Sequence, residues 1–278
     1  MAGVELSLAG RVALITGGSR GIGAETVRIF AEAGARVVFN YRQAREQAHA
    51  LMAACGGPSA CVAVEQELST PAEGRALVRT VVEAFGRLDA LVVNHGVWPA
   101  EDAGIERMSD EQWRRTMAVN LDSVFGLVQG AVAQMELQGE PATGRDAAGV
   151  GNAAGFGNGV RGHIVLISST AGQRGEAGHA DYAVTKGALI SLTKSLSSEL
   201  APRGILVNCV APGWVATEMS AAALDDPRMG PRIAAGIPVG RVATAREIAG
   251  PVLFLCTPLA GFISGEVVNV NGGAVLAG

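Results

Sequence analysis

A tyrosine and a lysine on one predicted helix are the residues of this chain best suited to chemistry. Tyr182 and Lys186 are four positions apart in the predicted helix Asp181–Ala201, so their side chains share a face. A phenol has an ordinary pKa of about 10, which is too high for efficient proton transfer near neutral pH. Because a neighbouring ammonium stabilises the phenolate, we expect Lys186 to lower the pKa of Tyr182.

A serine stands where a hydrogen-bond donor to a substrate carbonyl would be needed. Ser169 directly follows the predicted strand His163–Ser168 and comes thirteen residues before Tyr182. Its hydroxyl can donate to a carbonyl oxygen on which negative charge develops. Ser168 is the alternative, but side chains alternate along a strand, which points it to the opposite face. We therefore expect Ser169, Tyr182 and Lys186 to act on a carbonyl or alcohol oxygen, without a metal.

A glycine-rich turn near the amino terminus predicts a dinucleotide site. Residues 16–23 read TGGSRGIG, after a predicted strand and before a predicted helix. Gly17 permits a tight turn, Gly21 lets the backbone approach a pyrophosphate, and Gly23 allows close packing of helix and strand. The N-terminus of the helix then offers N–H groups and a favourable dipole to the phosphates. The spacing, and the lack of a Gly-Lys-Ser/Thr sequence, disfavour a P-loop kinase or NTPase.

Short apolar runs alternate with longer amphipathic stretches, and this alternation sets the fold class. The strand runs are continuously apolar, as expected when helices cover both faces of a sheet. The sequence therefore predicts an α/β fold, with a doubly wound, mainly parallel sheet flanked by helices. The predicted strands are Arg11–Thr16, Arg36–Asn40, Cys61–Glu65, Ala90–Asn94, His163–Ser168, Leu206–Ala211 and Val267–Val270. The predicted helices are Gly21–Gly34, Arg42–Cys55, Pro71–Gly86, Ser109–Leu137, Asp181–Ala201 and Thr244–Cys256.

Two segments interrupt the alternation. Residues 138–162 are rich in Gly, Ala and Asn and offer few anchors for a core, so we expect a mobile surface insertion. Residues 218–240 contain three prolines and scattered apolar positions, which predicts a lid between the sixth strand and the last helix. With no linker between these parts, residues 1–278 are predicted to form a single domain.

The composition excludes several classes of protein. The chain has 278 residues, a formal net charge of −4 and no cluster of basic residues, which argues against a nucleic-acid partner or a polybasic membrane anchor. No apolar run has the length of a membrane span, and the first residues are not a secretion signal. The four cysteines lack metal-ligand spacing and are expected to be reduced thiols in a soluble cytoplasmic protein.

Five motifs in order resemble the short-chain dehydrogenase/reductase family over nearly the whole chain outside 138–162. They are the glycine turn, Asn94-His95-Gly96, Asn120, the set Ser169, Tyr182 and Lys186, and Pro212-Gly213. The resemblance implies a single-domain Rossmann fold with seven strands in the order 3-2-1-4-5-6-7. It also implies a catalytic role for Asn120, which holds a water beside Lys186, and a homotetramer. The closing stretch is similar to the 3-oxoacyl-(acyl-carrier-protein) reductase branch.

The resemblance also implies which residues contact a nicotinamide cofactor. Lys186 would grip the ribose as well as tune the phenol, Glu67-Leu68 would meet the adenine, and Val215 and Thr217 would meet the nicotinamide carboxamide and phosphate. His95, where the family usually has Ala, is expected to be a packed histidine. The full set of implied cofactor contacts is Gly17, Ser19, Arg20, Gly21, Ile22, Gly23, Asn40, Tyr41, Arg42, Glu67, Leu68, Asn94, Gly96, Tyr182, Lys186, Pro212, Gly213, Val215 and Thr217.

Charge at the end of the second predicted strand indicates the choice of cofactor. NAD-preferring sites usually place an acid there to hold the ribose hydroxyls. This chain has Asn40-Tyr41-Arg42, with no acid before Glu46, and Arg20 lies in the glycine turn. Two guanidiniums without a carboxylate suit a 2′-phosphate, so we expect NADP(H) rather than NAD(H).

Three functions are left open by the residues. The favoured one is an NADP(H)-dependent reductase of a 3-oxoacyl thioester or a related ketone. The second is an alcohol, polyol or sugar dehydrogenase of the same family, and the third is a nucleotide-sensing Rossmann protein without catalysis. The lack of a basic patch gives no independent support for docking of an acidic acyl carrier.

Overall fold

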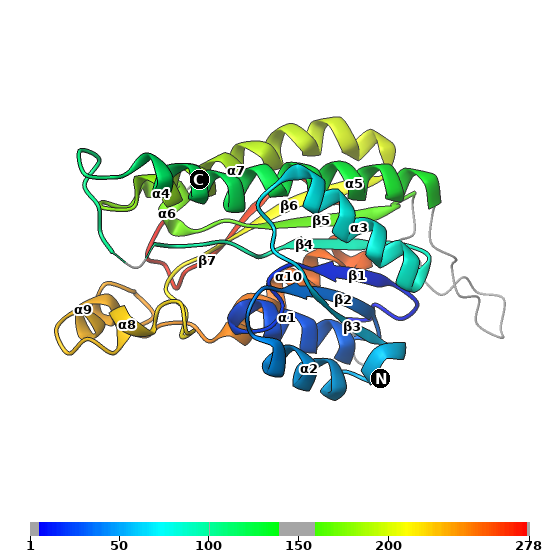
Figure 1. Ribbon diagram of the computed structural model, residues 1–278, viewed down its shortest axis with the longest axis horizontal. Coiled ribbons are helices and arrows are strands. Elements are labelled where there is room, and N and C mark those ends of the chain that lie inside the picture. The colour runs from blue at the N-terminus through cyan, green and yellow to red at the C-terminus, as the bar shows by residue number, and fades with distance from the viewer. Residues whose placement is uncertain (1–5, 100, 139–158, 277–278) are drawn as a thin grey trace.

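One parallel sheet organises the protein. The computed structural model describes residues 6–99, 101–138 and 159–276. Its strands are β1 (Val12–Ile15), β2 (Arg36–Tyr41), β3 (Cys61–Glu65), β4 (Ala90–Val93), β5 (Gly162–Ile167), β6 (Ile205–Pro212) and β7 (Val267–Val270). All neighbouring pairs are parallel, and their order is β3-β2-β1-β4-β5-β6-β7 (Figure 1). The predicted fold class and strand order are confirmed.

Helices cover both faces of this sheet. The described helices are α1 (Gly21–Glu32), α2 (Arg45–Ala54), α3 (Pro71–Phe85), α4 (Asp110–Met117), α5 (Ser123–Gln138), α6 (Thr170–Arg174), α7 (Ala180–Leu200), α8 (Ala221–Leu224), α9 (Met229–Ala235) and α10 (Ala245–Leu255). α1, α2 and α10 pack on one face, while α3, α5 and α7 pack on the other (Figure 1). Along β1, Ala13 and Ile15 pack in the core beneath α1, α2 and α10, whereas Val12 and Leu14 pack in the core beneath α3, α5 and α7. Burial on both faces explains why the run is continuously apolar.

The predicted helix Ser109–Leu137 is interrupted in the structure. A π-helical turn, Ala118–Asp122, separates α4 from α5. The stretch Asp110–Gln138 is long and apolar enough to cross a membrane by length and composition, and half of its most apolar window is buried. Such burial is typical of a core helix in a globular fold.

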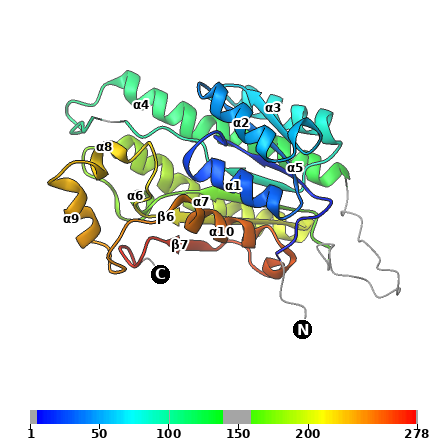
Figure 2. The same cartoon turned by 90° about the horizontal axis from the view of Figure 1, so that it is seen from below.

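The two segments that interrupt the sequence pattern have different outcomes. Most of the expected insertion, residues 139–158, lies outside the described residues, and its flanks belong to α5 and to the start of β5. The segment 218–240 folds as the two short helices α8 and α9, which lie at the same end of the molecule as α4 and α6 (Figure 2). The sequence pattern missed α6, α8 and α9, all of which are short.

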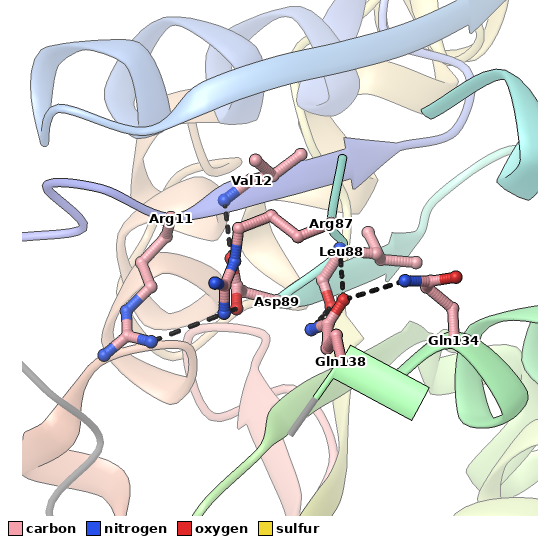
Figure 3. Close-up of polar contacts among 7 residues, drawn as sticks. All are labelled: Arg11, Val12, Arg87, Leu88, Asp89, Gln134 and Gln138. Atoms are coloured by element: carbon pink, nitrogen blue, oxygen red, sulfur yellow. Dashed lines mark hydrogen bonds and ion pairs between the residues drawn. The ribbon is translucent and has the colours of Figure 1, made fainter. Parts of the chain in front are cut away.

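A buried carboxylate fixes the amino ends of two central strands (Figure 3). Asp89 is fully buried, and it accepts hydrogen bonds from the backbone N–H of Val12 at 2.9 Å and from the Arg87 guanidinium at 2.6 and 2.8 Å. The Arg11 guanidinium lies 3.9 Å from the same carboxylate. A buried charge is stable only when it is paired and hydrogen-bonded, and Asp89 meets both conditions.

Glycines allow α3 and α5 to pack backbone against backbone. A Cβ atom on Gly126 would lie 2.0 Å from the carbonyl oxygen of Pro71, and a Cβ on Gly74 would lie 2.5 Å from that of Ser123. Neither distance is compatible with a side chain, because both neighbours are backbone atoms that cannot rotate away.

We therefore predict that Gly126→Ala destabilises the protein. The helices must separate to admit the methyl group, and the free energy of unfolding should fall by about 1–3 kcal/mol, as measured by denaturant titration. Gly130→Ala, one turn later on α5, is the control, because its Cβ would lie 3.3 Å from the Val78 side chain and 3.5 Å from the Arg75 Cα atom, both much longer distances. Equal stability of the Gly126 variant and the wild type would contradict the prediction.

Candidate active site

The predicted site residues converge on one cleft at the carboxyl ends of the strands. The cleft has a volume of about 350 Å³, and its walls include residues that follow β1, β2, β4, β5 and β6. The predicted residues that line it are Gly17, Ser19, Arg20, Gly21, Ile22, Asn40, Tyr41, Arg42, Glu67, Leu68, Asn94, Gly96, Ser169, Tyr182, Lys186, Pro212, Gly213, Val215 and Thr217. Gly23 and Asn120 are buried behind this wall. Ligands of doubly wound folds bind at this edge of the sheet.

The glycine turn has the geometry that its sequence predicts. Gly17 and Gly21 have φ angles of +65° and +54°, in the left-handed region that favours glycine. A Cβ on Gly23 would lie 2.1 Å from the carbonyl oxygen of Gly17, so only glycine fits there. Arg20, at the start of α1, supplies no side-chain cap, and Gly21 and Ile22 line the cleft. The turn therefore fits an anion such as a pyrophosphate.

Two asparagines hold this turn from either side. The Asn94 side-chain amide donates hydrogen bonds to the carbonyl oxygens of Thr16 at 3.0 Å and Gly17 at 3.2 Å. Asn40 accepts a hydrogen bond from the Gly17 N–H at 2.9 Å and donates to the carbonyl oxygen of Gln66 at 2.9 Å. Both asparagines line the cleft, and their side-chain amides fix the backbone of the glycine turn through these hydrogen bonds.

The end of the cleft beside β2 and β3 holds a carboxylate, Glu67, that the argument from charge did not take into account. Arg42 forms an ion pair with Glu67 at 3.1 Å, and Arg115 lies 3.7 Å from the same carboxylate. The premise that this end has guanidiniums and no carboxylate is therefore wrong, because β2 and β3 are adjacent and bring their carboxyl ends together. Arg20 and Arg42 both line the cleft, as expected.

Ser169, Tyr182 and Lys186 meet at the opposite end. The Lys186 ammonium donates a hydrogen bond to the carbonyl oxygen of Ile167 at 2.8 Å and lies 5.7 Å from the centre of the Tyr182 ring. Ser169 caps the start of α6, where its hydroxyl accepts a hydrogen bond from the Ala171 N–H at 3.1 Å, and it lines the cleft together with Tyr182. Ser168 instead donates to the carbonyl oxygen of Lys186 at 2.7 Å, on the buried side, as strand alternation predicts.

The expected lowering of the phenol pKa by Lys186 is wrong for this structure. Burial raises the pKa of Tyr182 to about 12; the Ser169 hydrogen bond opposes this shift, and the nearby Glu176 carboxylate adds to it. Burial also lowers the pKa of Lys186 to about 8. Desolvation is the largest cause of both shifts, and the ammonium donates its hydrogen bond to Ile167 rather than to the phenol. The phenol thus stays protonated at neutral pH.

Asn120 is fixed in the π-helical turn behind the catalytic end. Its amide oxygen accepts from the N–H of Val97 at 2.8 Å, and its amide nitrogen donates to the carbonyl oxygen of Val97 at 2.9 Å and to Thr185 at 3.2 Å. A Cβ on Gly96 would lie 3.3 Å from the Asn120 oxygen and 3.5 Å from the Lys186 nitrogen. Both groups therefore approach the cleft at Gly96. π-helical turns recur at functional sites.

His95 is a packed histidine, as expected. Its Nδ1 atom is hydrogen-bonded to Thr16 Oγ1 at 2.8 Å, and its Nε2 atom to Ser123 Oγ at 2.8 Å and to the Val119 carbonyl oxygen at 3.1 Å. Burial, followed by the charge of Lys186, lowers the pKa of His95 to about 4. The imidazole is therefore neutral at pH 7 and joins the end of β1 to the π-helical turn.

The sequence places substrate recognition in the segments His95–Ile105, Gly172–His179 and 218–240, and three of four further side chains that line the cleft lie in the first two of these segments. Trp98, Trp214, Arg174 and Glu176 all line the cleft. Trp214, which directly follows Pro212-Gly213, lies outside those segments. Within residues 6–99, 101–138 and 159–276, no group of three His, Cys, Asp or Glu side chains is placed to hold a metal ion.

Comparisons with known proteins agree with the fold. The family described as short chain dehydrogenase matches residues 11–146, and that described as Enoyl-(Acyl carrier protein) reductase matches residues 150–275. The chain is 36% identical over 274 residues to a 3-oxoacyl-(acyl-carrier-protein) reductase of Synechocystis sp., and the match covers 97% of this chain and 99% of that protein.

Two solved structures extend the likeness to three dimensions. A 3-ketoacyl-(acyl-carrier-protein) reductase from Brucella melitensis complexed with NADH has a TM-score of 0.82 at 29% identity, over 97% of this chain and 100% of that one. A protein from Beutenbergia cavernae with bound NADP has a TM-score of 0.82 at 33% identity, over 98% of this chain and 99% of that one. The chain belongs to the short-chain dehydrogenase/reductase family of oxidoreductases.

Proposed function

We propose that this protein is an NADP(H)-dependent carbonyl reductase that acts on 3-oxoacyl thioesters or closely related ketones. The observation that carries the proposal is that Ser169, Tyr182 and Lys186 line the same cleft as the glycine turn at Gly17 and Gly21. A phenol that keeps its proton suits an acid, which reduction of a carbonyl requires. The name of the Synechocystis relative supports the thioester class.

The chain's own residues supply the proton and the electrostatics of this reaction. A nicotinamide dinucleotide, when bound, supplies the hydride that goes to the carbonyl carbon. Tyr182 gives the proton of its hydroxyl to the carbonyl oxygen, and Ser169 donates a hydrogen bond to that oxygen as negative charge develops. The Lys186 ammonium stabilises the phenolate that Tyr182 becomes. Asn120, which is hydrogen-bonded to Val97 and Thr185, holds a water molecule beside Lys186 that relays protons.

The residues of the cleft fit a dinucleotide. The glycine turn and the start of α1 would hold the pyrophosphate. The adenosine would lie against Tyr41, Leu68 and the guanidiniums of Arg20 and Arg42. Arg20 and Arg42 favour a 2′-phosphate, which would compete with Glu67 for Arg42. Beyond β6, Pro212, Gly213, Val215 and Thr217 would face the nicotinamide.

We further propose a cytoplasmic homotetramer with a substrate lid at 218–240. The lid proposal is supported by Glu218, Met219 and Ser220, which line the cleft beside α8. Association is supported by two apolar side chains that remain about half exposed, Phe125 on α5 and Val184 on α7.

Replacement of the phenol should abolish reduction. In Tyr182→Phe, kcat/KM for NADPH-dependent reduction of acetoacetyl-coenzyme A should fall by about 10²–10⁴-fold, because the proton donor is lost. The dissociation constant for NADPH should change little. Tyr41→Phe, at the adenosine end, is the control and should alter only the KM for the cofactor. Substantial turnover by Tyr182→Phe would exclude the proposed acid.

The ratio of kcat/KM for NADPH to that for NADH tests the cofactor assignment. Arg42→Asp should shift this ratio toward NADH by about tenfold or more, since a charge-assisted contact becomes a repulsion. Glu67→Gln should move it in the opposite direction, because Arg42 loses its competing carboxylate. An unchanged ratio in Arg42→Asp would remove the basis for NADP(H).

The pH profile of reduction should report Lys186 rather than Tyr182. With the pKa of Lys186 at about 8, the ammonium loses its proton as the pH rises, and kcat/KM should decline above about pH 8. Tyr182, with a pKa of about 12, keeps its proton throughout this range. Lys186→Arg keeps its charge, so its slower reaction should lack the decline. A wild-type profile that stays level up to pH 10 would be inconsistent with this assignment.

A further inference from the structure

Two tryptophans form a right-angled corner at the substrate end of the cleft. Trp98 follows β4 and Trp214 follows β6, and both line the same cleft as Ser169 and Tyr182. Their ring centres are 6.4 Å apart and their planes meet at 85°. This is the edge-to-face arrangement that aromatic rings prefer. Neither residue has a role in the proton transfer proposed above.

Trp98 is held in place by its surroundings. One face stacks on His179, with ring centres 4.6 Å apart and planes at 16°. His179 is itself 2% exposed and hydrogen-bonded through Nε2 to the carbonyl oxygen of Pro99 at 2.9 Å. Its Nδ1 atom lies 3.6 Å from Asp102. Because the indole is already ordered, binding of a ligand against it costs little side-chain entropy of Trp98.

The corner offers a mainly apolar surface to a ligand. Both indoles line the cleft, and all but one of the ring atoms of an indole are carbon, so their surface is mainly apolar. Met219, which is 52% exposed, lines the same cleft and adds a thioether, which packs well against aromatic rings. The carboxylate of Glu176 faces Trp98 and His179, and it is therefore engaged within the wall.

A right-angled pair of rings favours one shape of ligand. A flat aromatic ring in the corner can lie offset over one indole and meet the edge of the other, so that two aromatic pairs form. A saturated ring of similar size buries comparable apolar area but forms neither pair. We infer that Trp98 and Trp214 are specificity-determining residues and that the enzyme prefers ketones with an aryl group next to the carbonyl. This inference deepens the proposed function and rests on it.

Binding of two matched ketones tests the inference without turnover. Acetophenone and cyclohexyl methyl ketone are both methyl ketones of eight carbons, and neither can be reduced when the enzyme is saturated with oxidised NADP. Calorimetric titration of the wild-type enzyme should give a dissociation constant about fivefold lower for acetophenone. Trp98→Leu and Trp214→Leu should bring the two constants together, while Trp98→Phe should retain most of the preference.

The chain supplies a matched control in its remaining tryptophan. Trp113 lies on α4 and is not among the residues that line the cleft, so Trp113→Phe should keep the full aryl preference. Thermal unfolding of each variant checks that the fold is intact. Equal binding of the two ketones by the wild type, or a preference that survives in both leucine variants, would overturn the inference. If the enzyme reduced neither ketone and also failed to reduce the thioester with NADPH, the proposed function would be wrong. The inference about aryl binding would not be affected, because binding is measured without turnover.

Discussion

The arrangement of the site depends on hydrogen bonds that join the ends of β1 and β4, where the direction of chain progression through the sheet reverses. Thr16 and Asn94 stand at these ends: the Asn94 N–H donates to Thr16 Oγ1 at 3.0 Å, and its side chain holds the backbone of the glycine turn. His95 connects the same hydroxyl to the π-helical turn that contains Asn120. The turn that fits a pyrophosphate and the residues near Lys186 are thereby fixed relative to one another, as electrostatic catalysis requires.

Burial governs the electrostatics at the catalytic end. It raises the pKa of Tyr182 and lowers that of Lys186, so each group is pushed toward its neutral form. A neutral phenol is the form that gives a proton to a carbonyl oxygen, and an ammonium with a lowered pKa can exchange protons near neutral pH. An arginine in place of Lys186 would supply charge but could not exchange its proton. The same low-dielectric setting thus suits both proposed roles.

What the sequence predicted correctly follows from local spacing and chain direction. Tyr182 and Lys186 share a face because they are one helical turn apart, and Ser169 and Gly17 reach the cleft because each ends a strand of a parallel sheet. The remainder depends on contacts between distant segments. Glu67 forms an ion pair with Arg42, which is 25 positions away in the chain. Trp98 and Trp214 are in contact although they follow different strands, β4 and β6. The desolvation of Tyr182 depends on the packing of several elements around it.

The most direct test of the central claim follows a single hydrogen atom. The enzyme is given a 3-oxoacyl thioester and, in two separate reactions, reduced NADP that carries deuterium at one or at the other face of nicotinamide C4, and the alcohol product is analysed by mass spectrometry and NMR. The account predicts one deuterium on the carbinol carbon, transferred from only one of the two faces, with the hydroxyl proton derived from solvent through Tyr182. A product whose carbinol carbon carries hydrogen from solvent, or deuterium from both faces equally, would contradict it.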